Sequence, residues 1–356
     1  MATLHKHRVY ISSNARANHY LLAEIIPNEK FYSQFSNIDC CYKRIARQLF
    51  AYCDEYELHN VHVLANDKLP VVRFNDESYQ LETKKQMLFF YNPRYHEAHK
   101  LHYTPEQKSK KIRFLFLATG DELRANSAQF HNKVQKVLSQ LQEQLFFEQP
   151  AFKLRDHQHL TYDLFAKEKG DKQSYGYKLR SLYPRYKSRN CNIPNNYAQM
   201  TYATFTVPIT RAIKTQFQTL INNNDMTKFY DYFANQFKQL CLENKLTHAA
   251  MVANGATPII RNSKIDKNES NFELQKLSFD IESKETDIKF FYQTDKLLEA
   301  IHFVIVATQS DEHEMGFGRF MNQVEKTICS FSNDLAINKT RQDLSVRFFQ
   351  HISYPY

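Results

Sequence analysis

Apolar residues along this chain recur at two spacings, and each spacing predicts one kind of element. Between residues 41 and 56, apolar side chains such as Ile45 and Leu49 recur every three or four positions, which predicts an amphipathic helix. The run IRFLFLAT, which begins at Ile112, is almost continuously apolar, and a short run of this kind is typical of a strand buried on both faces. The chain is therefore expected to mix helices with a buried sheet.

The same spacings, followed along the chain, predict an ordered series of elements. Asn66, Asp67 and Pro70 favour a turn between two short strands. In the first half we expect helices at 41–56 and 128–142 and strands at 7–13, 61–66, 70–74, 86–92, 112–119 and 145–154. In the second half we expect helices within 210–244 and at 319–332 and strands at 202–209, 248–254, 258–262, 276–281, 288–293, 301–308 and 344–352.

The two halves resemble each other residue by residue. Residues 42–73 align without a gap on residues 230–261, and 112–122 align on 301–312. The identical pairs include Tyr42/Tyr230, Ala46/Ala234, Gln48/Gln236, Cys53/Cys241, Leu58/Leu246, Ala65/Ala253, Asn66/Asn254, Pro70/Pro258 and Arg73/Arg261. We interpret the chain as a tandem internal duplication.

The element order predicts the fold class. Each half reads as β-α-β-β-α-β with an extra hairpin, which favours an α+β fold made of two tandem copies of a ferredoxin-like domain. We expect the first repeat at 1–155, a basic, tyrosine-rich linker or loop at 156–195, and the second repeat at 196–356. A winged or three-layer α/β unit with the same element order remains an alternative.

Composition narrows the class of partner. The net charge is +9, which favours anionic partners such as nucleic acid. Only 6 glycines are present, which argues against a glycine-rich phosphate loop. No apolar run is long enough to cross a membrane, and the 6 cysteines show no C-x-x-C motif. We therefore expect a cytoplasmic protein without a membrane association, with Cys53 and Cys241 as small core residues.

The segment between the repeats has the most unusual composition of the chain. Residues 166–190 interleave basic residues with tyrosines and sustain no hydrophobic period. Basic side chains neutralise phosphates, and tyrosine rings offer stacking faces to unpaired bases. The segment is therefore a candidate nucleic-acid-binding clamp, or a solvated linker, and its candidate contact residues are Tyr175, Tyr177, Lys178, Arg180, Tyr183, Arg185, Tyr186, Lys187 and Arg189.

Polar positions that recur in both halves are further candidates. Arg73 and Arg261 occupy the same repeat position, where they could form a symmetric pair of phosphate contacts. The other shared polar positions have a structural explanation, because Asn favours turns and acids favour helix N-termini. The histidines of HEAHKLH, which are His96, His99 and His102, could hold a metal, but the flanking prolines favour a solvated loop.

Short acidic motifs raise an enzymatic alternative. The stretch SFDIES resembles the first acidic motif of proofreading exonucleases, in which Asp280 and Glu282 would be metal ligands on one strand face. Lys284 extends this to an E-x-K pattern like that of other nucleases. No matching acidic motif follows downstream, so these three residues remain weak candidates for catalysis.

A glycine-containing stretch suggests a comparison with RNA-binding proteins. The sequence MGFGRF at 315–320 resembles the glycine-rich loop of the CRISPR RNA-binding proteins that pair ferredoxin-like domains. In this chain the stretch precedes a predicted helix instead of the last strand, so we infer no membership of that family.

Three functions from different classes fit these features. We expect a non-catalytic protein that holds RNA or single-stranded DNA in a basic cleft between two duplicated domains, without a cofactor or a metal. The first alternative is a metal-dependent nuclease that uses Asp280 and Glu282. The second is a self-assembling structural protein or a subunit of a larger nucleoprotein complex.

Overall fold

The computed structural model describes most of the chain as two compact units. The described residues are 16–74, 86–91, 99–118, 127–145, 152–163, 198–255, 258–262, 276–308, 314–334 and 345–355. The first unit is built mainly from residues 17–159 and the second mainly from residues 199–350. Both units combine helices with β-sheet, so the fold is α+β, as the sequence predicts.

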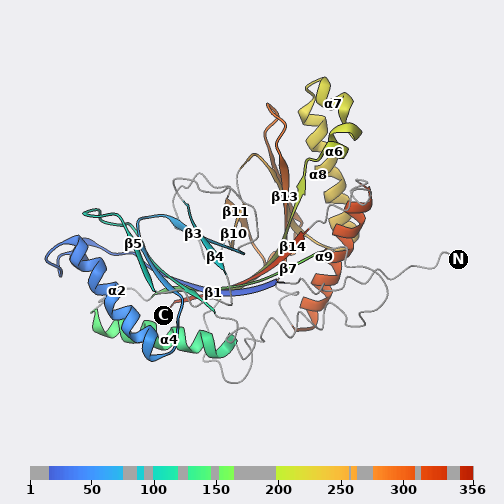
Figure 1. The fold of residues 1–356 in the computed structure, drawn as a ribbon. Helices are drawn as coiled ribbons and strands as arrows, with labels where there is room; N and C mark the ends of the chain where they lie inside the picture. The colour runs from blue at the N-terminus through green and yellow to red at the C-terminus, as the bar shows by residue number, and fades with distance from the viewer. Residues whose placement is uncertain are drawn as a thin grey trace. The chain divides into compact units, whose positions relative to one another are not determined.

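The first unit contains a five-strand arrangement covered by helices (Figure 1). Its neighbouring strands follow the order β7-β1-β6-β2-β5. β1 and β2 both pair antiparallel with β6, whereas β5 pairs parallel with β2. The elements are β1 (Arg16–Ile25), α1 (Glu29–Tyr32), α2 (Ile38–Glu55), β2 (Val61–Ala65), β3 (Leu69–Phe74), β4 (Gln86–Tyr91), β5 (Lys100–Tyr103), β6 (Ile112–Leu117), α4 (Ser127–Gln144) and β7 (Lys153–Asp163).

The second unit has the same strand order, and among the described residues its element order differs only by one more short helix before α8. Its strands run β14-β8-β13-β9-β12, with β8 and β9 antiparallel to β13 and with β12 parallel to β9. The elements are β8 (Ala198–Pro208), α6 (Arg211–Gln216), α7 (Gln218–Asn222), α8 (Met226–Glu243), β9 (His248–Ala253), β10 (Ile259–Asn262), β11 (Lys276–Phe279), β12 (Asp287–Tyr292), β13 (Ala300–Val306), α9 (Glu314–Asp334) and β14 (Ser345–Pro355).

Each unit carries an inserted pair of strands, and this pair is not a hairpin. β3 pairs with β4, and β10 pairs with β11, and both pairs are parallel. Parallel strands cannot be joined by a tight turn, because the chain must return to the end where the first strand began. The expected inserted hairpin is therefore corrected to a small parallel pair of strands in each unit.

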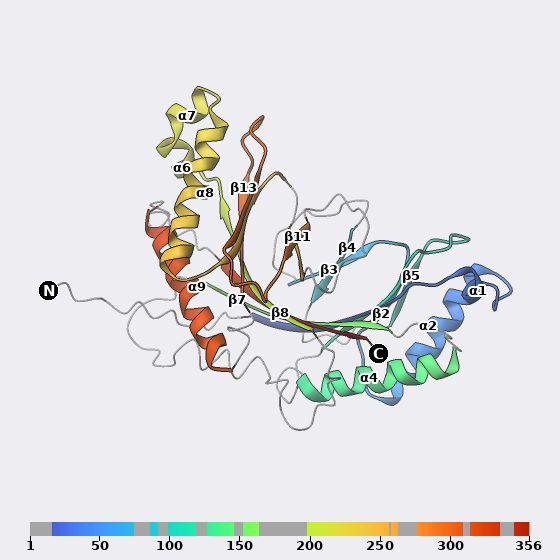
Figure 2. The ribbon, with the colours of Figure 1, turned by 180° about the vertical axis from the view of Figure 1, so that it is seen from behind.

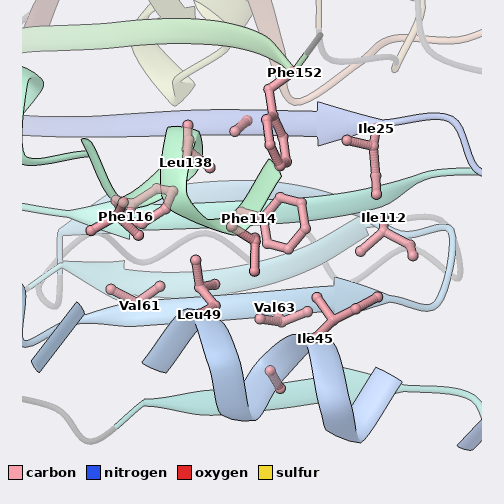
Figure 3. Packing of buried hydrophobic residues seen from close by; sticks show 14 of the residues in the cluster. Ile25, Ile45, Leu49, Val61, Val63, Ile112, Phe114, Phe116, Leu138 and Phe152 are labelled. Carbon is pink, nitrogen blue, oxygen red and sulfur yellow. The ribbon is translucent and has the colours of Figure 1, made fainter. Parts of the chain in front are cut away.

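The core of the first unit lies between its sheet and two helices. α2 and α4 cover the same face of the sheet, as the opposite views of Figures 1 and 2 both show. Figure 3 shows Ile45 and Leu49 of α2 next to Val63 of β2, and these residues are completely buried. The inserted pair β3–β4 covers the other face, where Val72 and Phe89 join a smaller apolar cluster. Burial of these side chains is the main source of stability for the unit.

The second unit has an aromatic core. The rings of Phe205 and Phe303 stack with centroids 4.7 Å apart, and Phe331 of α9 meets Phe303 edge to face at 5.0 Å. Phe237 of α8 completes the group, with its centroid 4.8 Å from that of Phe303. On the other face of the sheet, Ile260 of the inserted pair β10–β11 packs in a separate apolar cluster.

The two long central helices end in the same way. Glu57 follows α2 and Lys245 follows α8, and both have the positive φ of the left-handed region, 56° and 58°. The next amide then bonds back to the cysteine of the last turn, Leu58 N to Cys53 O and Leu246 N to Cys241 O, each at 2.8 Å. This 6→1 bond is that of a Schellman motif. Both cysteines are buried core residues, as expected.

Several predicted boundaries differ from the structure. The strand predicted at 7–13 lies outside the described residues, and β1 begins at Arg16. Of the strand predicted at 145–154, residues 153–154 are the start of β7, which begins at Lys153, and residues 146–151 lie outside the described ranges. The cysteines at 40, 41, 53, 241 and 329 are free thiols. Among the described helices, none is both long and apolar enough to span a membrane.

Candidate nucleic-acid interface

The residues expected to clamp nucleic acid belong to the segment that joins the two repeats in sequence. All of them, from Tyr175 to Arg189, lie in 164–197, outside the described residues. The candidate clamp therefore stays a prediction from composition.

Arg73 and Arg261 have matching backbone positions. Arg73 lies on β3 opposite Phe90 of β4, and Arg261 lies on β10 opposite Ser278 of β11. Each arginine thus belongs to the inserted parallel pair of its own unit. The structure describes only the backbone of these two residues, so their role in binding phosphate stays a prediction.

The acidic motif lies beyond the end of β11 and not on the strand face that the sequence predicts. β11 ends at Phe279, so Asp280 lies just beyond the strand and Glu282 lies in the turn that follows. Asp280 Oδ1 accepts a hydrogen bond from the Glu282 amide at 3.1 Å, which is the bond of an Asx turn. Strand alternation therefore does not place the two carboxylates on one face. Lys284 is exposed beyond the same turn.

Two histidines of HEAHKLH, His99 and His102, are within the described residues and contact neighbouring elements. His96 lies outside the described residues, but His102 is part of strand β5, so the expected solvated loop is wrong for this residue. His99 stacks on Phe50 of α2, and its Nε2 lies 3.0 Å from Asp54 Oδ1. Within the described ranges, no group of three or more His, Cys, Asp or Glu residues is arranged to hold a metal ion.

His102 is half-buried and pairs with the buried His62, a contact that periodicity does not predict. Its Nε2 lies 3.2 Å from Nδ1 of His62, whose Nε2 lies 3.0 Å from Oδ1 of Asn60. Phe89 of β4 packs against both rings. Burial, followed by the neighbouring His102, lowers the pKa of His62 to about 3. His62 is therefore neutral at physiological pH and acts as a hydrogen-bonding core residue.

A basic face on α2 is the strongest feature for anion binding among the described residues. Lys43, Arg44 and Arg47 are all exposed, and positions three and four apart lie on the same side of a helix. None of the three forms an ion pair with a carboxylate of the described residues. Arg44 lies 5.9 Å from the ring centroid of Phe35, a cation–π contact that leaves its positive charge unneutralised. We call Lys43, Arg44 and Arg47 the α2 basic face.

The corresponding helix of the second unit lacks this face. The aligned residues of α8 are Asp231, Tyr232 and Asn235. Asp231 accepts a hydrogen bond from the hydroxyl of Tyr292, and Tyr232 packs edge to face against Phe217 at 4.9 Å. The α2 basic face therefore belongs to the first unit only, and the fold itself does not require it.

Sequence reasoning passed over the α2 basic face, although its signal was present. The three cations lie within the predicted helix at 41–56, on positions that the apolar period leaves to solvent. Assigning each charged residue to a helix face would have found them.

Comparisons with known proteins identify a family. The chain matches the family described as "Protein of unknown function (DUF3083)" over residues 40–354. Neither the curated proteins nor the solved structures contain a significant match. Because the family match extends through both units, the chain as a whole, and not one of its repeats, belongs to the DUF3083 family of proteins of unknown function.

Proposed function

We propose that this protein binds RNA or single-stranded DNA without catalysis, through the α2 basic face and the basic, tyrosine-rich segment around 175–189. The observation that carries the proposal is the α2 basic face: three exposed cations within two turns of one helix, with no carboxylate of the described residues to neutralise them. Like charges four positions apart, such as Lys43 and Arg47, destabilise an isolated helix by a few tenths of a kcal/mol. Phosphates bound along the helix would turn this repulsion into attraction.

The arrangement favours contacts to phosphates over reading of bases. Lys and Arg on an exposed helix reach the backbone of a nucleic acid and give affinity that depends on salt. The tyrosines at 175, 177, 183 and 186 add ring faces on which unpaired bases can stack, which favours single strands. Arg73 and Arg261 are further candidate phosphate contacts in the same proposal.

We also propose that the two units are duplicated ferredoxin-like domains, with repeats at 1–155 and 196–356 and a linker or loop at 156–195. Without β5 and the inserted pair, the strand order β7-β1-β6-β2 matches the 4-1-3-2 order of a four-stranded βαββαβ sheet. Shared hydrogen bonds support a common origin of the units. Tyr42 Oη accepts from Ser109 N and donates to Gln107 O, both at 2.8 Å, and Tyr230 makes the same pair of bonds to Leu298 N and Lys296 O at 3.0 and 3.1 Å.

Fluorescence anisotropy with short labelled RNA, single-stranded DNA and duplex DNA tests the proposal. The α2 variant replaces Lys43, Arg44 and Arg47 with Gln and should weaken binding of single strands at least tenfold. The matched control replaces Arg211, Lys214 and Lys238, which are exposed on helices of the second unit, with Gln. It removes the same amount of charge and should change the affinity less than threefold.

A second variant tests the segment outside the described residues. Neutralising Lys178, Arg180, Arg185, Lys187 and Arg189 should weaken binding in the same assay. If neither variant differs from the control, binding does not use these surfaces. Absence of any binding at low salt would refute the proposed function.

The other two functions are outcomes of the same experiments. Cleavage of a probe that requires a divalent metal and is lost in Asp280→Ala would support a nuclease. Stable oligomers that form without nucleic acid, in a protein that binds no probe, would support a structural or assembly role. No contact among the described residues favours either of them over binding.

A further inference from the structure

A fully buried polar cluster joins three elements of the first unit. Asp156 of β7 lies between two histidines, with Oδ1 2.7 Å from Nε2 of His19 on β1 and Oδ2 3.2 Å from Nδ1 of His131 on α4. None of the three residues is more than 1% exposed. Burial alone would raise the pKa of Asp156, but the two histidines outweigh burial and hold the pKa well below its ordinary value. Asp156 is therefore ionised, and both rings donate to it.

The second unit fills the same three positions with residues of different chemistry. His19 corresponds to Thr201, because the amide of Ala118, directly after β6, donates to His19 O at 2.9 Å and the amide of Ala307, directly after β13, donates to Thr201 O at 2.8 Å. His131 corresponds to Met321, since each follows the buried phenylalanine of the pair Phe130/Phe320 on its helix.

Asp156 corresponds to Phe348. The sequences LRDHQHLTY at 154–162 and VRFFQHISY at 346–354 align without a gap. The residues that follow Asp156 and Phe348 also make equivalent ring stacks. The ring centroid of His157 lies 4.5 Å from that of Tyr20, and the ring centroid of Phe349 lies 4.8 Å from that of Tyr202. Thr201, Met321 and Phe348 are each 1% exposed, so the fold accepts a mainly apolar set where the first unit has a charged one.

A buried charged cluster is weak support for stability, because apolar residues of similar size often stabilise a core equally well or better. The cluster has a larger effect on the free energy of alternative folds in which β7 and β14 change places. If β7 took the place of β14, the carboxylate of Asp156 would be buried beside Thr201 and Met321 without the two histidine rings that contact it in the first unit. If β14 took the place of β7, the ring of Phe348 would leave two buried histidines without their acceptor. Both arrangements bury unsatisfied polar groups, which is costly.

We propose that the His19–Asp156–His131 cluster prevents the last strands of the two similar units from exchanging places during folding. Exchange of equivalent elements is a characteristic folding failure of chains with repeated domains. The proposal rests on the correspondence between the two units and is independent of nucleic-acid binding.

The test replaces the three cluster residues of the first unit with the residues at the corresponding positions of the second unit. The full chain with His19→Thr, His131→Met and Asp156→Phe should keep its urea midpoint at pH 7, because this set already packs well in the second unit. On refolding from denaturant, its yield of native monomer by size-exclusion chromatography should fall at least twofold below that of the wild type. The lost fraction should appear as dimers or misfolded species. Refolding of this variant with the wild-type yield would overturn the proposal.

If the triple variant does not fold, a single substitution tests whether burying a carboxylate among the apolar residues of the second unit is costly. Phe348→Asp places the carboxylate in the apolar set, as an exchanged β7 would. The second unit should then lose cooperative unfolding at pH 7, whereas the conservative Phe348→Leu should retain it. A Phe348→Asp protein as stable as Phe348→Leu would show that exchange carries no such penalty, and the proposal would fail.

Discussion

At the scale of single residues, His62 makes the stability of the first unit depend on pH between neutral and mildly acidic conditions. The pKa of His62 is lowered from its ordinary value of 6.5 to about 3, so the folded protein resists its protonation. Below about pH 6.5 the unfolded chain gains a proton at this residue and the folded chain does not. Stability is therefore fully present above about pH 6.5 and falls as the pH decreases towards 3.

Replacement of this histidine should flatten the pH dependence. With wild-type protein, the free energy of unfolding should fall by up to about 1.4 kcal/mol per pH unit between pH 6 and pH 5 because of His62. His62→Gln should remove most of this slope, although it lowers the stability at pH 7. Urea unfolding at several pH values measures the slope. The exposed His59→Gln is the control, and an equal slope in both variants would contradict the assignment.

The ends of the two central helices offer a second residue-scale prediction. Glu57 and Lys245 adopt the left-handed conformation, which costs a residue with a side chain roughly 1–2 kcal/mol and costs glycine almost nothing. After allowance for the greater freedom of glycine in the unfolded chain, Glu57→Gly and Lys245→Gly should each stabilise the protein by about 0.5–1 kcal/mol. Thermal unfolding measures both changes, and a loss of stability in either variant would refute the explanation.

At the scale of elements, a tyrosine from each central helix holds the loop that leads into the central strand. Removing the hydroxyl in Tyr42→Phe leaves the buried amide of Ser109 without this acceptor, and Tyr230→Phe does the same to Leu298. We expect each variant to lose roughly 1–3 kcal/mol of unfolding free energy. Chemical denaturation followed by circular dichroism tests this. A loss of roughly 1–3 kcal/mol in one variant and a loss outside this range in the other would contradict an equivalent role of the two tyrosines.

The elements predicted from sequence are those whose burial produces a clear period. The period of 41–56 predicts α2 well, and the apolar run at Ile112 predicts β6, because both are packed against a large core. Strand β5 was missed because it has only four residues and lies at the end of the first unit's strand order, so no alternation of apolar and polar residues marks it. The parallel pairing of β3 with β4 was missed because strand direction leaves no trace in residue spacing.

The candidate sites were predictable to different degrees for similar reasons. The α2 basic face is local in sequence and could be read from a helical projection. The His19–Asp156–His131 cluster could not, because its members lie on three elements and each one alone looks like an ordinary polar residue. Asp280 and Glu282 were assigned to a strand face because the end of β11 at Phe279 has no strong turn signal such as glycine or proline.

At the scale of the whole molecule, the two units have the same architecture but different surfaces. The first carries the α2 basic face and the buried charged cluster, whereas the second has Asp231, Tyr232 and Asn235 on the matching helix and an aromatic core. Two copies of one domain that keep the same fold but differ in surface residues can have different roles, one in binding and the other in structure. Under the proposed function, the helical phosphate contacts belong to α2 of the first unit, and we expect the helices of the second unit to contribute little.

The most direct test of this account is the salt dependence of nucleic-acid binding. Anisotropy with one labelled single strand, measured over a series of salt concentrations, gives the slope of log Kobs against log salt. The wild-type slope should be clearly negative, and replacing Lys43, Arg44 and Arg47 with Gln should reduce its magnitude by about 2, which corresponds to three lost phosphate contacts on a single strand. The Arg211, Lys214 and Lys238 control should keep the wild-type slope. Equal slopes in all three proteins, or no binding at the lowest salt, would contradict the central claim.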